Sequence, residues 1–177
     1  MIPPELAWIR EAIDTCVQRE GARFADEFIY VTIRHGIVTS VDDDFWHVDG
    51  FTMRLIHRPE HNYLWSDVYP TEILAQPFTF PDDFDPLRHN LFWYIQEHAD
   101  ESKAVSLPPR RLACLDVYHI HRRPPAATGT TRTLIRITFC PVEIEDDSCQ
   151  HNPLMEPTMY NRLGSRDFRD KLTRYGA

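Results

Sequence analysis

Residues 112–122 read LACLDVYHIHR and residues 131–139 read TRTLIRITF, and these two segments decide the fold class. Both are rich in aliphatic, aromatic and β-branched residues, which favour extended strands over helices. Residues 124–129 between them read PPAATG, and their prolines and glycine favour a turn. The sequence therefore predicts a pair of neighbouring strands late in the chain.

Alternation along the two predicted strands brings histidines and arginines together on one face. Successive side chains of a strand point to opposite faces, so residues two apart share a face. The residues that share these faces are Val117, His119 and His121 on the first strand, and Arg132, Leu134, Arg136 and Thr138 on the second. Cations and imidazoles are costly in a dry core. We therefore expect this face to line a cavity that holds a metal ion and an anion.

The rest of the chain predicts a sheet-rich domain with helices near its ends. Apolar residues recur every three or four positions over residues 4–19, which predicts a helix that ends at Gly21. Residues 28–33 read FIYVTI and predict a strand that breaks at Gly36. Further elements are predicted as short strands over 52–57 and 63–68, a short helix over 86–98 and a helix over 157–175.

Length and composition exclude several classes of protein. The 177 residues are ordinary for one domain, and a hydrophobic content of 42% disfavours disorder. A formal net charge of −8 argues against a nucleic-acid partner, because nucleic-acid binders usually carry a basic surface. No apolar stretch approaches the ~20 residues that span a bilayer, and the N-terminus does not read as a signal peptide.

The four cysteines favour a reducing compartment. They show no CxxC pairing, and Cys114 and Cys140 lie in apolar runs, where a cysteine acts as a small buried hydrophobe. We therefore expect a cytoplasmic protein that acts on a small molecule and binds neither nucleic acid nor membrane. The sequence predicts no oligomeric state.

The motif H-V-D at residues 47–49 supplies residue types that bind metal. His121 follows its aspartate by 72 residues, and Arg132 follows His121 by eleven. Two imidazoles and one carboxylate hold non-haem Fe(II) on one face and leave three positions open for chemistry. A guanidinium on the next strand can bind the carboxylate of a dicarboxylate co-substrate through two hydrogen bonds. His119, on the same predicted face as His121, is the alternative distal ligand.

Three segments of the chain resemble the Fe(II)/2-oxoglutarate-dependent oxygenase superfamily, in particular its taurine-dioxygenase-like and clavaminate-synthase-like branches. They are residues 46–49 (WHVD), 62–67 (NYLWSD) and 112–141. In these branches the H-x-D motif is followed by a strand resembling T-L-W-S, and here residues 63–66 read YLWS. The arginine pair R-x-x-x-R that follows the distal histidine in these branches is reproduced by residues 132–136, which read RTLIR.

The resemblance implies a fold and a division of the chain. The fold is mainly β, with a double-stranded β-helix (jelly-roll) core and flanking N- and C-terminal helices. One oxygenase domain then covers residues 1–177. Its parts are a helical N-terminal segment at about 4–19, the β-helix core at about 27–141 and a C-terminal extension at 142–177.

The resemblance also implies a role for each candidate residue. The Fe(II) ligands are His47, Asp49 and His121. The 2-oxoglutarate-binding residues are Arg132, which pairs with the distal carboxylate, and Tyr63, which replaces the family's threonine. The candidates for substrate binding are Arg136, His119, Phe51 and Trp65, with Arg136 as the substitute anchor for 2-oxoglutarate.

The implied reaction is the hydroxylation, or a related C–H oxidation, of a small molecule that bears a carboxylate, such as an amino acid or a natural-product intermediate. Two other functions fit parts of the pattern. The first is a cupin-type metal dioxygenase, which does not use 2-oxoglutarate, because His119 and His121 resemble the paired histidines of cupins. The glutamate that normally continues the cupin motif is missing from residues 122–126, RRPPA. The second is a jelly-roll binding module without catalytic activity, in which the histidines are structural.

Overall fold

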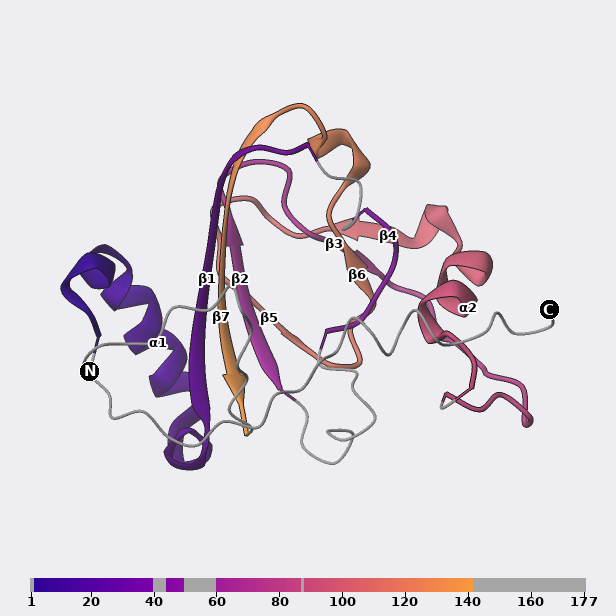
Figure 1. The fold of residues 1–177 in the computed structure, drawn as a ribbon, viewed down its shortest axis with the longest axis horizontal. Helices are drawn as coiled ribbons and strands as arrows, with labels where there is room; N and C mark the ends of the chain where they lie inside the picture. Colours follow the sequence, from indigo (N-terminus) through magenta and orange to yellow (C-terminus); the bar gives the residue numbers. More distant parts are fainter. Residues whose placement is uncertain (1, 40–43, 50–59, 87, 142–177) are drawn as a thin grey trace.

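The computed structural model describes residues 2–39, 44–49, 60–86 and 88–141, and these form two antiparallel sheets (Figure 1). The main sheet has the order β1-β7-β2-β5, from β1 (Phe28–Ile37), β7 (Thr131–Cys140), β2 (His61–Ser66) and β5 (Ala113–Asp116). The second sheet has the order β4-β3-β6, from β4 (Ala104–Ser106), β3 (Glu72–Leu74) and β6 (His121–Arg122). The expectation of a mainly β fold is confirmed.

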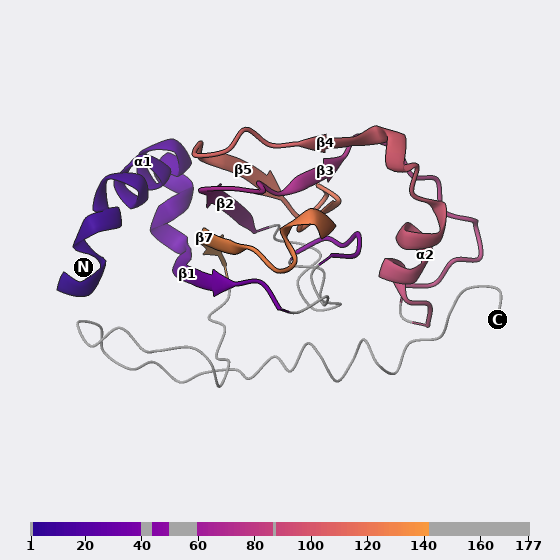
Figure 2. The same ribbon diagram turned by 90° about the horizontal axis from the view of Figure 1, so that it is seen from above.

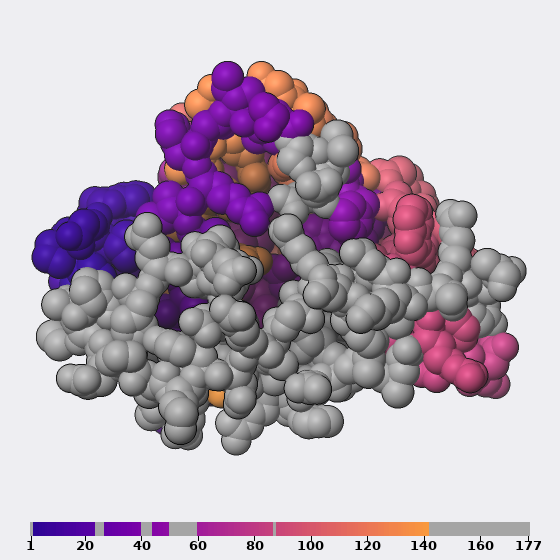
Figure 3. Space-filling view, in the orientation of Figure 1, coloured from indigo at the N-terminus to yellow at the C-terminus, as the bar shows by residue number. Residues whose placement is uncertain are grey.

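Two helices lie at opposite ends of the described part (Figures 1 and 2). They are α1 (Arg10–Glu20) and α2 (Leu91–His98), which the space-filling view shows in indigo and pink (Figure 3). Short 3₁₀ turns accompany them: η1 (Pro4–Ile9), η2 (Gly21–Asp26), η3 (Glu101–Lys103) and η4 (Pro125–Ala127). Within the residues described, no helix has both the length and the apolar character that crossing a membrane requires.

The N-terminal helical segment packs on one face of the main sheet, as its apolar spacing predicts. The buried side chains of this core are Ile9, Ile13, Cys16, Tyr63, Ile135, Ile137 and Phe139. Each aliphatic side chain buried there stabilises the fold by roughly 1.5–3 kcal/mol. Gly21 ends the helix with φ +60°, a conformation that glycine adopts without a Cβ penalty.

Strand β1 is longer than its sequence pattern predicts. It pairs with β7 from Phe28 opposite Cys140 to Ile37 opposite Thr131. Gly36, where we expected the strand to break, pairs with Arg132 instead. Its φ of +143° is open to glycine but strained for other residues, so pairing continues through the position.

The prediction of one strand over residues 112–122 is wrong, because the chain turns in its middle. The Asp116 carboxylate accepts a hydrogen bond from the Tyr118 backbone N–H at 2.8 Å, and the Asp116 carbonyl accepts one from the His119 N–H at 3.2 Å. This aspartate turn ends β5, and the chain enters the second sheet as β6. His119 and His121 therefore do not share the face of one strand.

The other predicted elements are close to those observed. Strand β2 lies two residues before the predicted 63–68, and α2 occupies the second half of the predicted 86–98. Asn90 caps α2, because its side-chain oxygen accepts hydrogen bonds from the Phe92 and Trp93 N–H groups. The predicted strand at 52–57, the predicted helix at 157–175 and the C-terminal extension lie outside the described residues.

Candidate metal centre

His47, Asp49 and His121 converge in space. One ligand atom from each lies within 4.8 Å of the other two. His47 and His121 form a two-way antiparallel bridge, with N–H···O=C distances of 3.0 and 2.8 Å. The bridge brings the H-V-D motif to the edge of β6, and Asp49 follows His47 by two residues. The structure thus brings together the three residues that the sequence predicts as metal ligands.

The two imidazoles are oriented in the same way. Nδ1 of His47 lies 2.8 Å from the Phe45 carbonyl, and Nδ1 of His121 lies 2.8 Å from the His119 carbonyl. A carbonyl oxygen only accepts, so each Nδ1 carries the proton and donates it. In the neutral ring the lone pair is then on Nε2. This backbone contact fixes the tautomer that binds a metal through Nε2.

Asp49 lies between an imidazole of one sheet and a guanidinium of the other. Its Oδ2 is 3.5 Å from Nε2 of His121 on β6 and 3.1 Å from Nη1 of Arg136 on β7. Burial by itself raises the pKa of Asp49, but the hydrogen bond to His121 and the Arg136 charge outweigh it and hold the pKa far below its ordinary value. Asp49 is therefore an ionised carboxylate.

The same contacts act on His121, which is 5% exposed. Burial lowers the pKa of an imidazole, but the hydrogen bond and charge of Asp49 raise the pKa of His121 above its ordinary value. A metal ion must therefore compete with a proton for the His121 imidazole.

A packed network behind the site holds the H-V-D motif in place. Trp46 is fully buried, and its Nε1 donates to Glu101 at 2.9 Å. The guanidinium of Arg122 lies 4.1 Å above the Trp46 ring and pairs with Glu101 (2.7 and 2.9 Å) and Glu72 (2.8 Å). Together with Leu74 and Ile95, Trp46 forms the second core, between β3 and α2.

Aromatic rings border His47. The ring centroids of Phe45 and Phe92 lie 5.5 and 6.5 Å from that of the imidazole. Phe45 is 36% exposed, and Phe92 is half-buried on α2. The site therefore has an aromatic wall on the side of α2.

The two arginines of the R-x-x-x-R pair lie on the same face of β7 but have different contacts. Arg136 reaches Asp49, whereas Nε of the buried Arg132 donates to the carbonyls of Val68 and Tyr69 at 3.3 and 3.0 Å. The two arginines are four residues apart, which is roughly 13 Å along a strand. Arg136, and not Arg132, is therefore the arginine that touches a ligand residue.

Tyr63 and Trp65 point away from the metal centre, contrary to the roles expected for them. Both belong to the face of β2 that packs toward α1, because the alternation puts Asn62 and Leu64 on the other face. The Tyr63 hydroxyl donates to Glu20 at the end of α1. Tyr63 is thus not placed to share a co-substrate with Arg132, and Trp65 is not placed to contact a substrate there.

The remaining candidates are His119 and Phe51. His119 lies in the turn after β5, and its half-exposed ring is 2.7 Å from the Asp116 carboxylate. Only its backbone carbonyl contacts His121. Of the two histidines, His121 is the one that joins the cluster. Phe51 lies outside the described residues.

Sequence reasoning missed a polar group beside Arg136. Asn62 is buried, accepts a hydrogen bond from the Thr138 hydroxyl and donates to the buried Glu60 carboxylate at 3.1 Å. Burial raises the pKa of Glu60, and the negative charge of Asp49 adds to that rise despite the Asn62 hydrogen bond. The signal available in the sequence is the polar residues at alternate positions 60 and 62.

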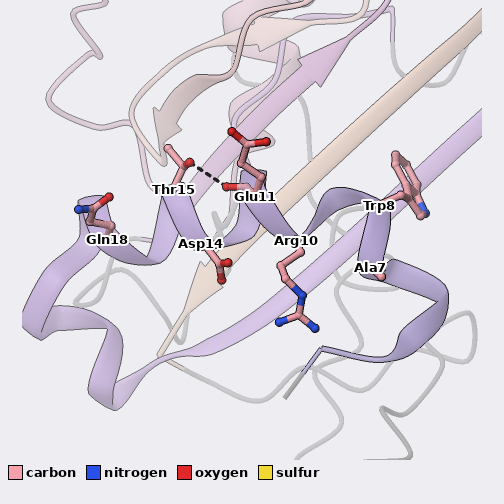
Figure 4. Close-up of a pocket in the computed structure, with 7 residues that line it drawn as sticks. All are labelled: Ala7, Trp8, Arg10, Glu11, Asp14, Thr15 and Gln18. Carbon is pink, nitrogen blue, oxygen red and sulfur yellow. Dashed lines mark hydrogen bonds between the residues drawn. The ribbon is translucent and has the colours of Figure 1, made fainter.

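A second group of polar side chains, also missed, lies under α1. Glu20 is hydrogen-bonded by Tyr63 and by Nδ1 of His61 (2.8 Å), and Cys114 lies beside them. A shallow depression on the outer side of α1 is lined only by residues 7–18 of the helical segment and gathers no metal-binding set (Figure 4).

No protein-family model, no curated protein and no solved structure matches this chain.

Proposed function

We propose that this chain is a non-haem Fe(II)- and 2-oxoglutarate-dependent oxygenase. The convergence of His47, Asp49 and His121, three residues far apart in the sequence, is the observation that carries the proposal. Two imidazoles and one carboxylate form the donor set of this class of iron site. In this proposal the two antiparallel sheets correspond to a double-stranded β-helix core, since the site lies between β6 of one sheet and β7 of the other.

The donor set fits a divalent ion. Two ligand atoms that are each about 2.1 Å from one ion and at right angles lie about 3 Å apart. The observed 3.5 Å between His121 and Asp49 is close to this value, so small side-chain rotations close the site. Because backbone carbonyls engage Nδ1 of both imidazoles, Nε2 is the nitrogen of each ring that would bind the metal.

In its bound form the iron supplies O2 activation coupled to the oxidative decarboxylation of 2-oxoglutarate to succinate and CO2. The protein's side chains position the reactants and exclude water. Arg136 balances the charge of Asp49 and is the proposed partner of a substrate carboxylate. Arg132, farther along the same face, is the proposed partner of the distal carboxylate of 2-oxoglutarate.

The proposed substrate is a small molecule with a carboxylate, such as an amino acid or a natural-product intermediate. Arg136 is the charged group that supports this choice, because its side chain is 33% exposed beside the metal ligands. Phe45 and Phe92 offer an apolar wall for the carbon skeleton that is oxidised. The proposed outcome is hydroxylation or a related C–H oxidation.

The test is anaerobic addition of Fe(II) and 2-oxoglutarate to the full chain, followed by O2. We expect the weak visible charge-transfer band of the chelate, and then succinate. His47→Ala and Asp49→Ala should lose both signals and stay folded, whereas His119→Ala, a matched histidine outside the cluster, should retain the band. Metal-dependent O2 consumption without succinate would favour a cupin-type dioxygenase. Absence of the band in the unmodified chain would contradict the proposal and favour the jelly-roll binding module without catalytic activity.

A further inference from the structure

A second set of metal-binding side chains lies on the face of the main sheet opposite the metal centre. His61 is the first residue of β2, and Cys114 in β5 pairs with Tyr63 in the register. His61, Tyr63 and Cys114 therefore share the face that α1 covers. Glu20, the last residue of α1, completes the group from above. Three different elements thus contribute one ligand-type side chain each.

The group is compact. The ligand atoms of Glu20, His61 and Cys114 all lie within 4.8 Å of one another. The Glu20 side chain is only 5% exposed, and its two oxygens are 2.8 and 3.1 Å from Nδ1 of His61. A thiol, an imidazole and a carboxylate at this spacing match the ligands of zinc, which binds all three types.

We propose that Glu20, His61 and Cys114 form a second site, which binds a zinc-like divalent ion and joins α1 to the main sheet. This site is independent of the proposed oxygenase function, because it shares no residue with the H-V-D centre. The sulfur ligand sets the preference: thiolate favours Zn²⁺ over Mg²⁺ or Ca²⁺, which take oxygen ligands.

Binding requires a defined movement of protons. Arg23 Nη1 lies 3.0 Å from Nε2 of His61, and a guanidinium only donates, so the imidazole proton is on Nδ1 and points at Glu20. A metal ion on Nδ1 shifts that proton to Nε2 and releases the proton of the Cys114 thiol to solvent. The Nε2–H then faces the guanidinium, so Arg23, whose side chain is 38% exposed, has to turn away.

Cobalt(II) gives a direct readout, because a thiolate ligand produces an intense near-ultraviolet charge-transfer band that imidazole and carboxylate do not. We expect this band when Co²⁺ alone is added to the reduced full chain. It should persist in His47→Ala, which removes the other centre, and in Cys140→Ser and Cys149→Ser. It should disappear in Cys114→Ser and weaken strongly in His61→Gln and Glu20→Gln.

Arg23→Gln is the most discriminating variant. The glutamine carbonyl can accept from Nε2–H in the metal-bound state, so we expect Co²⁺ and Zn²⁺ to bind about tenfold more tightly, the size typical of contacts to the outer nitrogen of a histidine ligand. Zn²⁺ should also raise the melting temperature of His47→Ala, which lacks the other centre, and of the double variant His47→Ala/Cys140→Ser, but not of His47→Ala/Cys114→Ser. No thiolate band in the unmodified chain, or a band that survives Cys114→Ser, overturns the proposal; so does weaker binding by Arg23→Gln.

Discussion

Replacing Arg136 by methionine should change the stability and the metal affinity of the protein in opposite directions. Arg136 donates to the Asp49 carboxylate at 3.1 Å, and the two side chains are 33% and 18% exposed. A hydrogen bond to a charged group contributes about 1.5–3 kcal/mol when buried. Partial exposure lowers this figure, so we expect Arg136→Met to destabilise the metal-free chain by about 1–2 kcal/mol.

The metal affinity should rise in the same variant. A cation on Asp49 and a divalent ion on Asp49 repel each other, since both are held within a few ångströms of one carboxylate. At about 5 Å and an effective dielectric constant of about 20, even two unit charges repel by roughly 3 kcal/mol. Allowing for solvent screening, we expect Fe²⁺ or Mn²⁺ to bind about 10- to 100-fold more tightly.

Two measurements test this reasoning. Urea unfolding with a chelator present gives the free energy of unfolding, and calorimetric titration with Mn²⁺ gives the affinity. Arg132→Met is the matched control, because Arg132 lies on the same strand face and binds backbone carbonyls instead of Asp49. It should lower stability without tightening metal binding. Unchanged or weaker Mn²⁺ binding in Arg136→Met would refute the idea that this arginine competes with a metal at Asp49.

Three further predictions concern other contacts. His121→Ala should abolish succinate formation while His119→Ala retains most of it, and equal losses would contradict the assignment of His121 as ligand. Arg122→Ala should destabilise the chain by about 2–4 kcal/mol in urea unfolding, because it leaves two carboxylates and the Trp46 ring without their cation; a change below about 0.5 kcal/mol would show that the network is dispensable. Burial raises the pKa of Asp67, but hydrogen bonds from the Thr133 and Val68 N–H groups outweigh it and lower the pKa below 3.8. The ionised Asp67 therefore stabilises the fold above pH 3.8, and this contribution is lost as the pH falls through the folded-state pKa. Asp67→Asn should make the free energy of unfolding depend less on pH on the acid side, as measured by urea unfolding at a series of pH values.

The sequence predicted most of the strands, and the convergence of His47, Asp49 and His121, for a physical reason. Strand β7 is a long segment rich in β-branched residues, so its extended conformation can be recognised from its own sequence without knowledge of the strands that it pairs with. The convergence of His47 and Asp49 was predictable because they are only two residues apart and follow Phe45 and Trp46, whose contacts hold this segment in place. The local motif thus carried most of the information about the site.

The errors arose where a tertiary or local contact outweighed the pattern. The Asp116 turn ends β5 through a side-chain hydrogen bond, which a count of β-forming residues does not register. Tyr63 was assigned to the metal side from its position in a motif, but the register of a strand decides on which face of the sheet each of its side chains lies. The Glu20–His61–Cys114 group joins residues from three elements, and no spacing within the sequence reports it.

Strand β2 explains why both faces of the main sheet carry polar groups. Its odd residues, His61 and Tyr63, hydrogen-bond to Glu20 under α1, and its even residue Asn62 hydrogen-bonds to Thr138 on the face toward the metal centre. A slip of one residue would exchange the two sets and separate the buried Tyr63 and Asn62 from their hydrogen-bond partners. The polar contacts on both faces therefore fix one register of β2 against β7, and the same register sets Arg136 opposite Leu64, within reach of Asp49.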